Sequence, residues 1–174
     1  MLLNKEQSGF TTIEIIVVVV IIGIVYAASW GWRGSLVNIR VKQAAFKLAA
    51  DIRCAQSYAL ASQNRTRVVF DVLNDSYSLS QENSGGGWTA LSEPGGGGTY
   101  TVNFRGSEYS GTDIVSLSLG TVNNALVFDK RGVPYGQNSA TGYNATLASQ
   151  GLINLNEGVN ITIQPQTGRV DKLY

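Results

Sequence analysis

Residues Ser8–Trp32 read SGFTTIEIIVVVVIIGIVYAASWGW, and this apolar run decides how the rest of the 174-residue chain is organised. Glu14 is the only charged side chain in the stretch. As a helix, residues 10–32 are about 33 Å long at about 1.5 Å per residue, which matches a hydrocarbon core of about 30 Å. A single segment that crosses lipid must satisfy its own backbone hydrogen bonds, so we predict a transmembrane helix over residues 10–32.

Two details of the stretch are not needed in an ordinary membrane anchor. One is Glu14, because an ionisable group at that depth is costly and marks a functional site. The other is the Gly9-Phe10 step, since cleavage there would create an α-ammonium group at Phe10 as a partner for Glu14. A secretory signal peptide would instead carry its charge before a shorter apolar core and end in small residues.

The residues around this step are Gly9, Phe10, Thr11, Thr12, Ile13 and Glu14. They resemble the class III leader of type IV pilins and type II secretion pseudopilins, in which a short polar leader ends in Gly before Phe-Thr-x-Ile-Glu. The resemblance implies that residues 1–9 are a leader cleaved off by prepilin peptidase, that Phe10 is N-methylated, and that Glu14 acts in filament assembly. Thr12 stands where Leu is usual, and Gly31 stands where many members carry Pro.

The charges of the leader predict the orientation of the chain in the membrane. Lys5 and the α-amino group favour a cytoplasmic N-terminus, and Glu6 opposes them. We therefore expect a single-pass protein of the bacterial inner membrane with a periplasmic C-terminal domain. The resemblance then places it in a periplasmic pseudopilus or a surface pilus. The implied partners are other minor and major pilins or pseudopilins, the prepilin peptidase and N-methylase, the inner-membrane assembly platform and membrane lipid.

Two interpretations stay open for the end of the span, where Gly31 and Gly34 bracket Trp32 and Arg33. Each Gly weakens a helix by about 1 kcal/mol relative to Ala. The pair indicates either a slightly frayed helix at the membrane boundary or a point at which the helix melts inside a filament.

From Ser35 the pattern becomes amphipathic and predicts that the helix continues to Ser62–Asn64, giving one helix over residues 10–63. Apolar residues recur at three- and four-residue spacing, as expected for a stripe that packs on a globular domain. They are Val37, Val41, Ala44, Ala45, Leu48, Ile52, Ala55 and Ala59. We expect the polar residues to lie largely on the other faces; they are Lys42, Lys47, Asp51, Arg53 and Gln56. Cys54 is expected on or near the stripe as a small buried residue.

Composition excludes several kinds of chemistry. The chain has a net charge of +1, no His, and Cys54 as its single cysteine, so an internal disulfide cannot form. The commonest general base and metal ligand is missing. The glycine tracts 85–87 and 95–98 lack the Lys-Ser/Thr of a phosphate-binding loop and favour a flexible loop. We predict no enzyme activity, no cofactor and no metal.

The remainder predicts an α+β fold in which the long helix packs on an antiparallel, sandwich-like β domain over residues 64–174. A glycine-rich loop is expected over residues 82–99. Expected strands are Arg67–Val72, Ser76–Ser80, Tyr100–Phe104, Asp113–Leu119, Ala125–Phe128, Leu152–Leu155 and Val159–Gln164. Asp71, Asn74 and Asp75 suit either a hairpin turn between the first two strands or a calcium site, and the turn explains them more simply.

The C-terminal half resembles the GspH/FimT group of minor pilins and pseudopilins. Its short motifs are Phe128-Asp129-Lys130-Arg131-Gly132 and the closing Thr167-Gly168-Arg169-Val170. This resemblance implies a structural subunit near the tip of a type II secretion pseudopilus or a type IV pilus. The sequence does not separate the two machines, which use the same leader and helix.

A second hypothesis is DNA capture at a pilus tip, for which some members of the group carry Gly-Arg-x-Arg. Arg169 and Lys172 are the candidate nucleic-acid contacts here, but Asp171 stands at the position of the second Arg. Phosphate contacts need clustered Lys and Arg, so DNA binding is not expected. A third class, a membrane-tethered hydrolase, lacks a nucleophile-base pair in the sequence.

Overall fold

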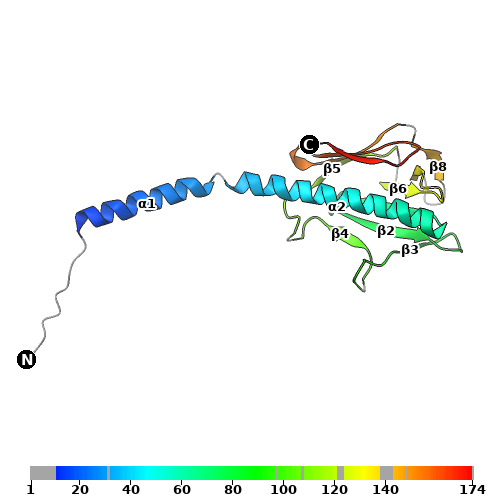
Figure 1. The fold of residues 1–174 in the computed structure, drawn as a ribbon, viewed down its shortest axis with the longest axis horizontal. Helices are drawn as coiled ribbons and strands as arrows, with labels where there is room; N and C mark the ends of the chain where they lie inside the picture. The colour runs from blue at the N-terminus through cyan, green and yellow to red at the C-terminus, as the bar shows by residue number, and fades with distance from the viewer. Residues whose placement is uncertain are drawn as a thin grey trace, which may run out of the picture. The chain divides into compact units, whose positions relative to one another are not determined.

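A computed structural model describes residues 11–30, 32–96, 98–106, 108–120, 124–137, 143–147 and 149–173 (Figure 1). The chain divides into two compact units, Met1–Leu36 and Val37–Tyr174. The leader and the predicted processing residues Gly9 and Phe10 lie outside the described residues, as does Gly31.

The first helix, α1, covers Thr12–Trp30, and a second helix, α2, covers Trp32–Ser62. The end of α2 at Ser62 agrees with the predicted end of the helix. The division of the chain into leader, helix and β domain stays a prediction. The apolar stripe is confirmed, because Val37 packs against the core at partial exposure and the other predicted positions are fully buried. These are Val41, Ala44, Ala45, Leu48, Ile52, Ala55 and Ala59. Small alanines on this face let the helix approach the sheets closely.

Seven strands form the larger antiparallel sheet, in the order β3-β2-β1-β6-β7-β8, with β4 also pairing with β2. Their bounds are β1 Thr66–Asp71, β2 Ser76–Glu82, β3 Trp88–Ala90, β4 Thr101–Asn103, β6 Ala125–Phe128, β7 Pro134–Gln137 and β8 Tyr143–Thr146. In β1 the side chains alternate, so that Val68 and Phe70 face the core while Arg67 and Val69 face outward.

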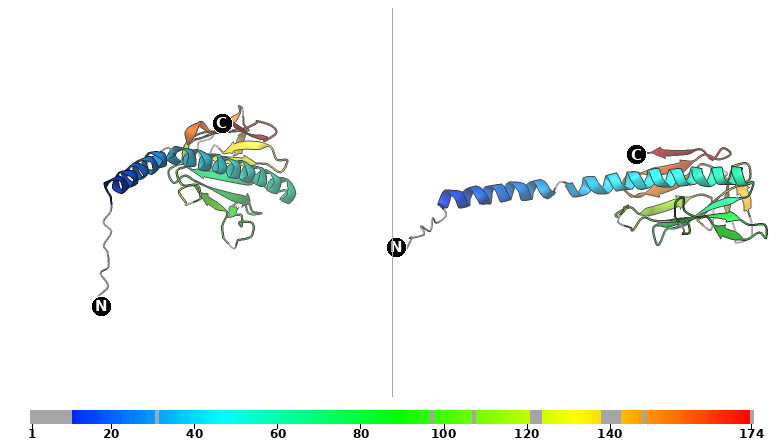
Figure 2. Two further views of the ribbon diagram at one scale, coloured as in Figure 1. Left: turned by 60° about the vertical axis from the view of Figure 1, so that its left-hand side comes forward. Right: turned by 60° about the horizontal axis from the view of Figure 1, so that its bottom comes forward.

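Four strands form the second antiparallel sheet, in the order β11-β10-β9-β5. Their bounds are β5 Ile114–Ser118, β9 Gly151–Leu155, β10 Asn160–Ile163 and β11 Val170–Leu173, and a short 3₁₀ helix, η1, covers Asn156–Gly158. Ile153, Ile161 and Ile163 are fully buried, and they join the side chains of α2 and of the larger sheet in one core. Figure 2 shows α2 alongside both sheets from two further directions. The predicted α+β class with a helix packed on antiparallel sheets is confirmed.

Several expectations from the sequence need correction. The expected loop 82–99 contains β3, and an isolated bridge joins Ser92 to Thr99. Strands β7 and β8 were not predicted. Pro134 and Gly136 weaken the strand pattern of β7, which is selected by its pairing with β6, and β8 is selected in turn by its pairing with β7. The polar face of α2 is also different from the expectation, since Asp51 is buried.

Candidate functional site

The exposed apolar helix α1 is the first candidate site. Thr11 caps its start: the Thr11 carbonyl accepts the N–H groups of Glu14 and Ile15 at 3.1 and 3.3 Å. Glu14 therefore lies in the first turn with its side chain exposed. The backbone N–H of Glu14 also donates a hydrogen bond to Thr11 Oγ1 at 3.4 Å. A carboxylate is favourable there because the helix N-terminus is the positive end of the dipole.

The remainder of α1 has the length and composition of a membrane span. Among the described residues, Thr12–Ser29 is the one helical segment apolar enough to cross a membrane, and none of it is buried. Its Ile and Val side chains are about half exposed or more. A helix that is apolar all round needs lipid or other helices as its surroundings. The apolar surface of α1 therefore needs lipid or other helices around it.

The two short C-terminal motifs meet at one side chain of α2, Gln56. Its Nε2 donates hydrogen bonds to the carbonyls of Gly132 and Thr167, each at 2.8 Å. Three residues earlier on α2, Arg53 Nη2 donates to the Val170 carbonyl at 2.6 Å. The motifs therefore hold the turn after β6 and the turn before β11 to the same helix. Their role in this structure is to join the two sheets.

The glycines of both motifs are required by this packing. Gly168 has a φ of +67°, and a Cβ there would lie 2.6 Å from Gln56 Nε2 and 3.1 Å from Phe128 Cε1. Gly132 has a φ of +75°, and its Cβ would lie 3.2 Å from Leu60 Cγ. Both positions combine left-handed backbone with close packing, a combination that only glycine satisfies without strain.

Asp51 organises a buried polar cluster that sequence reasoning missed. Asp51 as a residue is only 3% exposed. It accepts hydrogen bonds from Tyr77 Oη at 2.6 Å and Tyr100 Oη at 2.7 Å, and from Lys47 Nζ at 2.9 Å. The cluster connects α2 to β2 and to the residue before β4. The signal was present in the spacing, because Asp51 lies three residues after Leu48 and four before Ala55, both of the buried stripe.

The ionisation of this cluster follows from its burial. Burial and the Asp51 carboxylate raise the pKa of Tyr77 far above its usual range and also raise that of Tyr100. Burial alone would lower the pKa of Lys47, but its hydrogen bonds to Tyr100 and Asp51 outweigh this and raise it. The hydroxyls stay protonated and Lys47 stays charged, so all three remain donors to Asp51 at neutral pH. Cys54 is only half-buried, and burial raises the pKa of its thiol.

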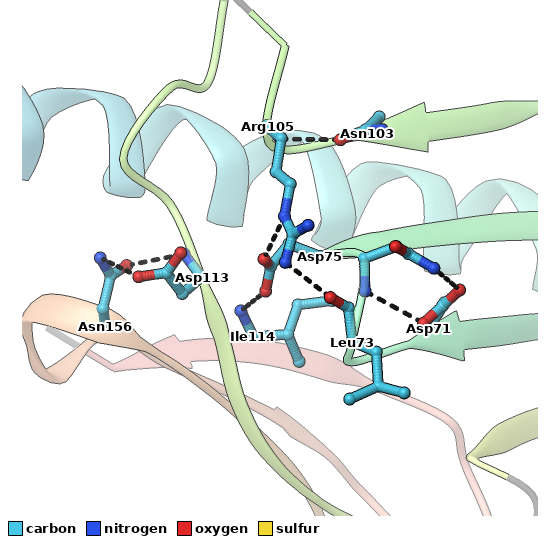
Figure 3. Close-up of polar contacts among 9 residues, drawn as sticks. Asp71, Leu73, Asp75, Asn103, Arg105, Asp113, Ile114 and Asn156 are labelled. Atoms are coloured by element: carbon cyan, nitrogen blue, oxygen red, sulfur yellow. Dashed lines mark hydrogen bonds and ion pairs between the residues drawn. The ribbon is translucent and has the colours of Figure 1, made fainter.

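The residues considered for calcium form a braced turn instead (Figure 3). Asp71 accepts both the backbone N–H and the side-chain amide of Asn74, at 3.1 and 2.6 Å. Asp75 is buried, pairs with Arg105 Nε at 2.9 Å and accepts the N–H of Ile114 at 3.0 Å. The described residues contain no group of three or more His, Cys, Asp or Glu that could hold a metal ion. These side chains are engaged in fixing the β1–β2 turn.

The candidate nucleic-acid residues Arg169 and Lys172 lie on or beside β11. Arg169 is exposed, and its Nε and Nη2 are both 2.9 Å from the Asp171 carboxylate. Lys172 Nζ lies 3.2 Å from the centre of the Phe46 ring. Burial and the nearby Arg53 lower the pKa of Lys172. The structure therefore engages both cations within the chain and does not bring them together as a basic stripe.

An apolar helix of membrane length, followed by a helix packed on two antiparallel sheets, defines a pseudopilin-like subunit. The sequence profile of the "Type II transport protein GspH" family matches residues 44–167, which is more than half of the chain. The chain therefore belongs to the GspH family of type II transport proteins. No curated protein matches it.

Two solved structures of the minor pseudopilin EpsH from the type II secretion system of Vibrio cholerae are similar to this chain. One has a TM-score of 0.55 at 15% identity, and the match covers 77% of this chain and 96% of the chain in that structure. The other has a TM-score of 0.54 at 13% identity, and the match covers 77% of this chain and 93% of the chain in that structure. At this identity the likeness shows a shared fold.

Proposed function

We propose that this protein is a minor pseudopilin that helps to start or extend a type II secretion pseudopilus near its tip. Its role is structural: the β domain is lifted from the inner membrane as a folded plug, and α1 packs among the helices of neighbouring subunits. The observation that carries the proposal is α1 itself, an apolar helix without a buried residue over Thr12–Ser29 and with Glu14 in its first turn, on a chain that matches the GspH family.

The proposal includes processing at the N-terminus. The leader of residues 1–9 is removed after Gly9 on the cytoplasmic side, and Phe10 is N-methylated. The new ammonium group of one subunit then pairs with Glu14 of a neighbour inside the filament, where little water is present. Breaking a buried ion pair strands the remaining charge at a cost of about 3–5 kcal/mol. The pair therefore fixes the depth at which each subunit sits.

The test is a set of Glu14 variants in cells that contain the secretion machinery. Glu14→Ala and Glu14→Gln should reduce co-purification with the other minor subunits and reduce secretion, whereas Glu14→Asp should retain part of both. Intact-mass measurement is the control, since every variant should still lose residues 1–9. Normal assembly and secretion by both Glu14→Ala and Glu14→Gln would show that the carboxylate does not set the register.

DNA capture is the alternative function, and it requires a basic surface. Arg169 is paired with Asp171, so the described residues give that alternative no favourable observation. We therefore propose the secretion role alone.

A further inference from the structure

The side of α2 that is turned away from the core carries large apolar residues of its own. Ile39, Phe46 and Leu60 are 49%, 54% and 46% exposed. Their spacings are multiples of seven, so they lie nearly in line along the helix as an outer row. Figure 1 shows α2 running across the outside of the two sheets. The solvent side of a surface helix is usually polar, so an apolar outer row is unusual.

The charges of α2 are almost all positive. Its basic residues are Arg33, Arg40, Lys42, Lys47 and Arg53. Its one acid, Asp51, is buried in the tyrosine cluster and does not reach the outer side. The whole chain has a net charge of only +1, so positive charge is concentrated on this helix. Basic and apolar groups together on the exposed side of a helix are typical of helices that lie on a membrane surface.

Arg53 and Lys172 place two like charges beside Phe46. Arg53 is exposed and lies seven residues after Phe46, and its Nη2 donates a hydrogen bond to the Val170 carbonyl. Lys172 Nζ lies over the Phe46 ring. Neither contact neutralises a charge, and no ion pair between described residues includes Arg53 or Lys172. Burial and the proximity of Arg53 lower the pKa of Lys172, as expected for a cation beside another cation. An anion at this cation pair would relieve the repulsion.

These observations define the chemistry of what covers the outer side of α2. The occupant must be anionic to complement the cation pair, and it must also offer an apolar region to the outer row. Duplex DNA meets the first requirement through its phosphates but not the second. A second copy of this chain, with a net charge of +1, offers no excess of negative charge. An anionic phospholipid surface meets both requirements, and it is close, because Ile39 follows the membrane-length segment Thr12–Ser29 by ten residues.

We propose that, before assembly, the outer side of α2 lies on the membrane surface, with the cation pair on anionic phospholipid headgroups and the outer row among them. In a straight helix Arg53 would be about 36 Å beyond Ser29, whereas the headgroup layer is only about 5–8 Å thick. The chain must therefore bend between Ser29 and Ile39. Gly31 and Gly34 lie in this stretch, and each weakens a helix by about 1 kcal/mol.

This inference rests on the proposed membrane anchoring by α1, and it adds a resting position from which the subunit is lifted into a filament. A basic side chain near an anionic membrane contributes about 1 kcal/mol. The cation pair should therefore favour the surface-bound position by about thirtyfold. The attraction is screened beyond about 8 Å at physiological salt, so the contact should weaken as salt is added.

The experiment uses the full chain with Cys54→Ser in lipid vesicles and a fluorescent probe on Ala50→Cys. Ala50 is exposed and lies between Phe46 and Arg53. The vesicles contain phosphatidylcholine alone or mixed with phosphatidylglycerol, and both kinds carry a lipid with a quencher in its headgroup. The probe should be quenched in the mixture, less so at high salt, and not in phosphatidylcholine. The positional control is Val115→Cys, which is exposed on β5 at the edge of the smaller sheet opposite β11 and should not be quenched.

A charge variant tests the cation pair directly. Arg53→Gln with Lys172→Gln should shift the balance about thirtyfold away from the lipid, so that quenching is lost. The matched control is Arg131→Gln with Arg169→Gln, which removes the same charge from two exposed cations that are paired with acids. That control should leave the quenching unchanged. Where the first variant lowers the amount of folded protein, Lys172→Gln alone takes its place, with a shift of about fivefold.

Several outcomes overturn the inference. They are equal quenching in both kinds of vesicle, no quenching in either, equal effects of the two double variants, and release of the probe from the mixed vesicles by duplex DNA. Flotation of the vesicles separates this inference from the proposed function. A chain that floats with an unquenched Ala50 probe keeps its membrane anchor and lacks only the surface contact. A chain that does not float overturns the anchoring by α1, and this inference with it.

Discussion

At the scale of single residues, Gly168 shows how a short motif acts in this fold. A side chain at this position meets both a left-handed backbone and the close approach of Gln56 and Phe128. Gly158 has a similar φ of +72° but has open space around its Cβ position. A comparison of substitutions at the two glycines therefore separates the effect of backbone strain from that of steric crowding.

We predict that Gly168→Ala lowers the free energy of unfolding more than Gly158→Ala does. Gly158→Ala should cost about 1 kcal/mol, from the left-handed backbone alone. Gly168→Ala should cost about 1–3 kcal/mol more, because Gln56 must move and two hydrogen bonds weaken. Thermal unfolding of both variants measures the difference, and equal losses would show that the packing around Gly168 relaxes freely.

Asp51 is the buried polar residue whose loss should destabilise the domain strongly. Asp51→Ala leaves two buried hydroxyls and the Lys47 ammonium without their acceptor, and it should lower the free energy of unfolding by about 3 kcal/mol. Asp171→Ala is the matched control, since its ion pair is exposed and contributes less than about 1 kcal/mol. Tyr77→Phe should add little to Asp51→Ala, because the two positions share one hydrogen bond. If the losses of unfolding free energy from Asp51→Ala and Tyr77→Phe were fully additive, the two side chains would not be coupled, and the cluster would be contradicted.

At the scale of elements, the turn from β6 to β7 depends on the ionisation of Asp129. Its carboxylate accepts the N–H groups of Arg131 and Val133 at 2.8 and 2.9 Å and pairs with the Arg131 guanidinium at 3.1 Å. Burial alone would raise the pKa of Asp129, but these donors outweigh it and lower the pKa. The ionised form is thus bound more tightly in the folded state.

A lowered pKa makes the turn sensitive to acid. The stabilisation by Asp129 is complete above the pKa of an unfolded aspartate, about 3.9, and is lost as the pH falls through the lower folded value. Asp129→Asn should therefore melt below the wild type at pH 7, and the gap should close as the pH falls from about 4 through the lowered pKa of the folded carboxyl group. Melting curves over this range measure it. A difference in melting temperature that does not depend on pH would mean that the charge of Asp129 does not stabilise the turn.

At the scale of the whole molecule, the unit from Val37 to Tyr174 has its own core. Cys54 is a free thiol, and the described residues hold no metal-binding cluster. Residues 37–174 produced alone should fold as a monomer, with a melting temperature that neither a chelator nor a thiol reductant shifts by more than about 2 °C, a change of well under 1 kcal/mol. A larger shift would reveal a bound metal or a disulfide between two copies of the fragment.

The features that depend on local pattern could be predicted from the amino-acid sequence. The length and apolarity of α1, the Gly9–Glu14 motif and the buried stripe of α2 are properties of neighbouring residues, because a helix brings together positions three and four apart. The hairpin of β1 and β2 is equally local, since its two strands are joined by a short turn. The family could be predicted from the same short motifs.

The contacts between residues far apart in the sequence depend on the folded chain. Tyr77 is 26 positions from Asp51, and Thr167 is 111 positions from Gln56, so no local pattern reveals these contacts. Strand β7 was likewise selected by its pairing with β6, and β8 by its pairing with β7, rather than by their own composition. The physical reason is that a buried polar group takes whichever partner the fold brings within about 3 Å, and that choice depends on the packing of the whole chain.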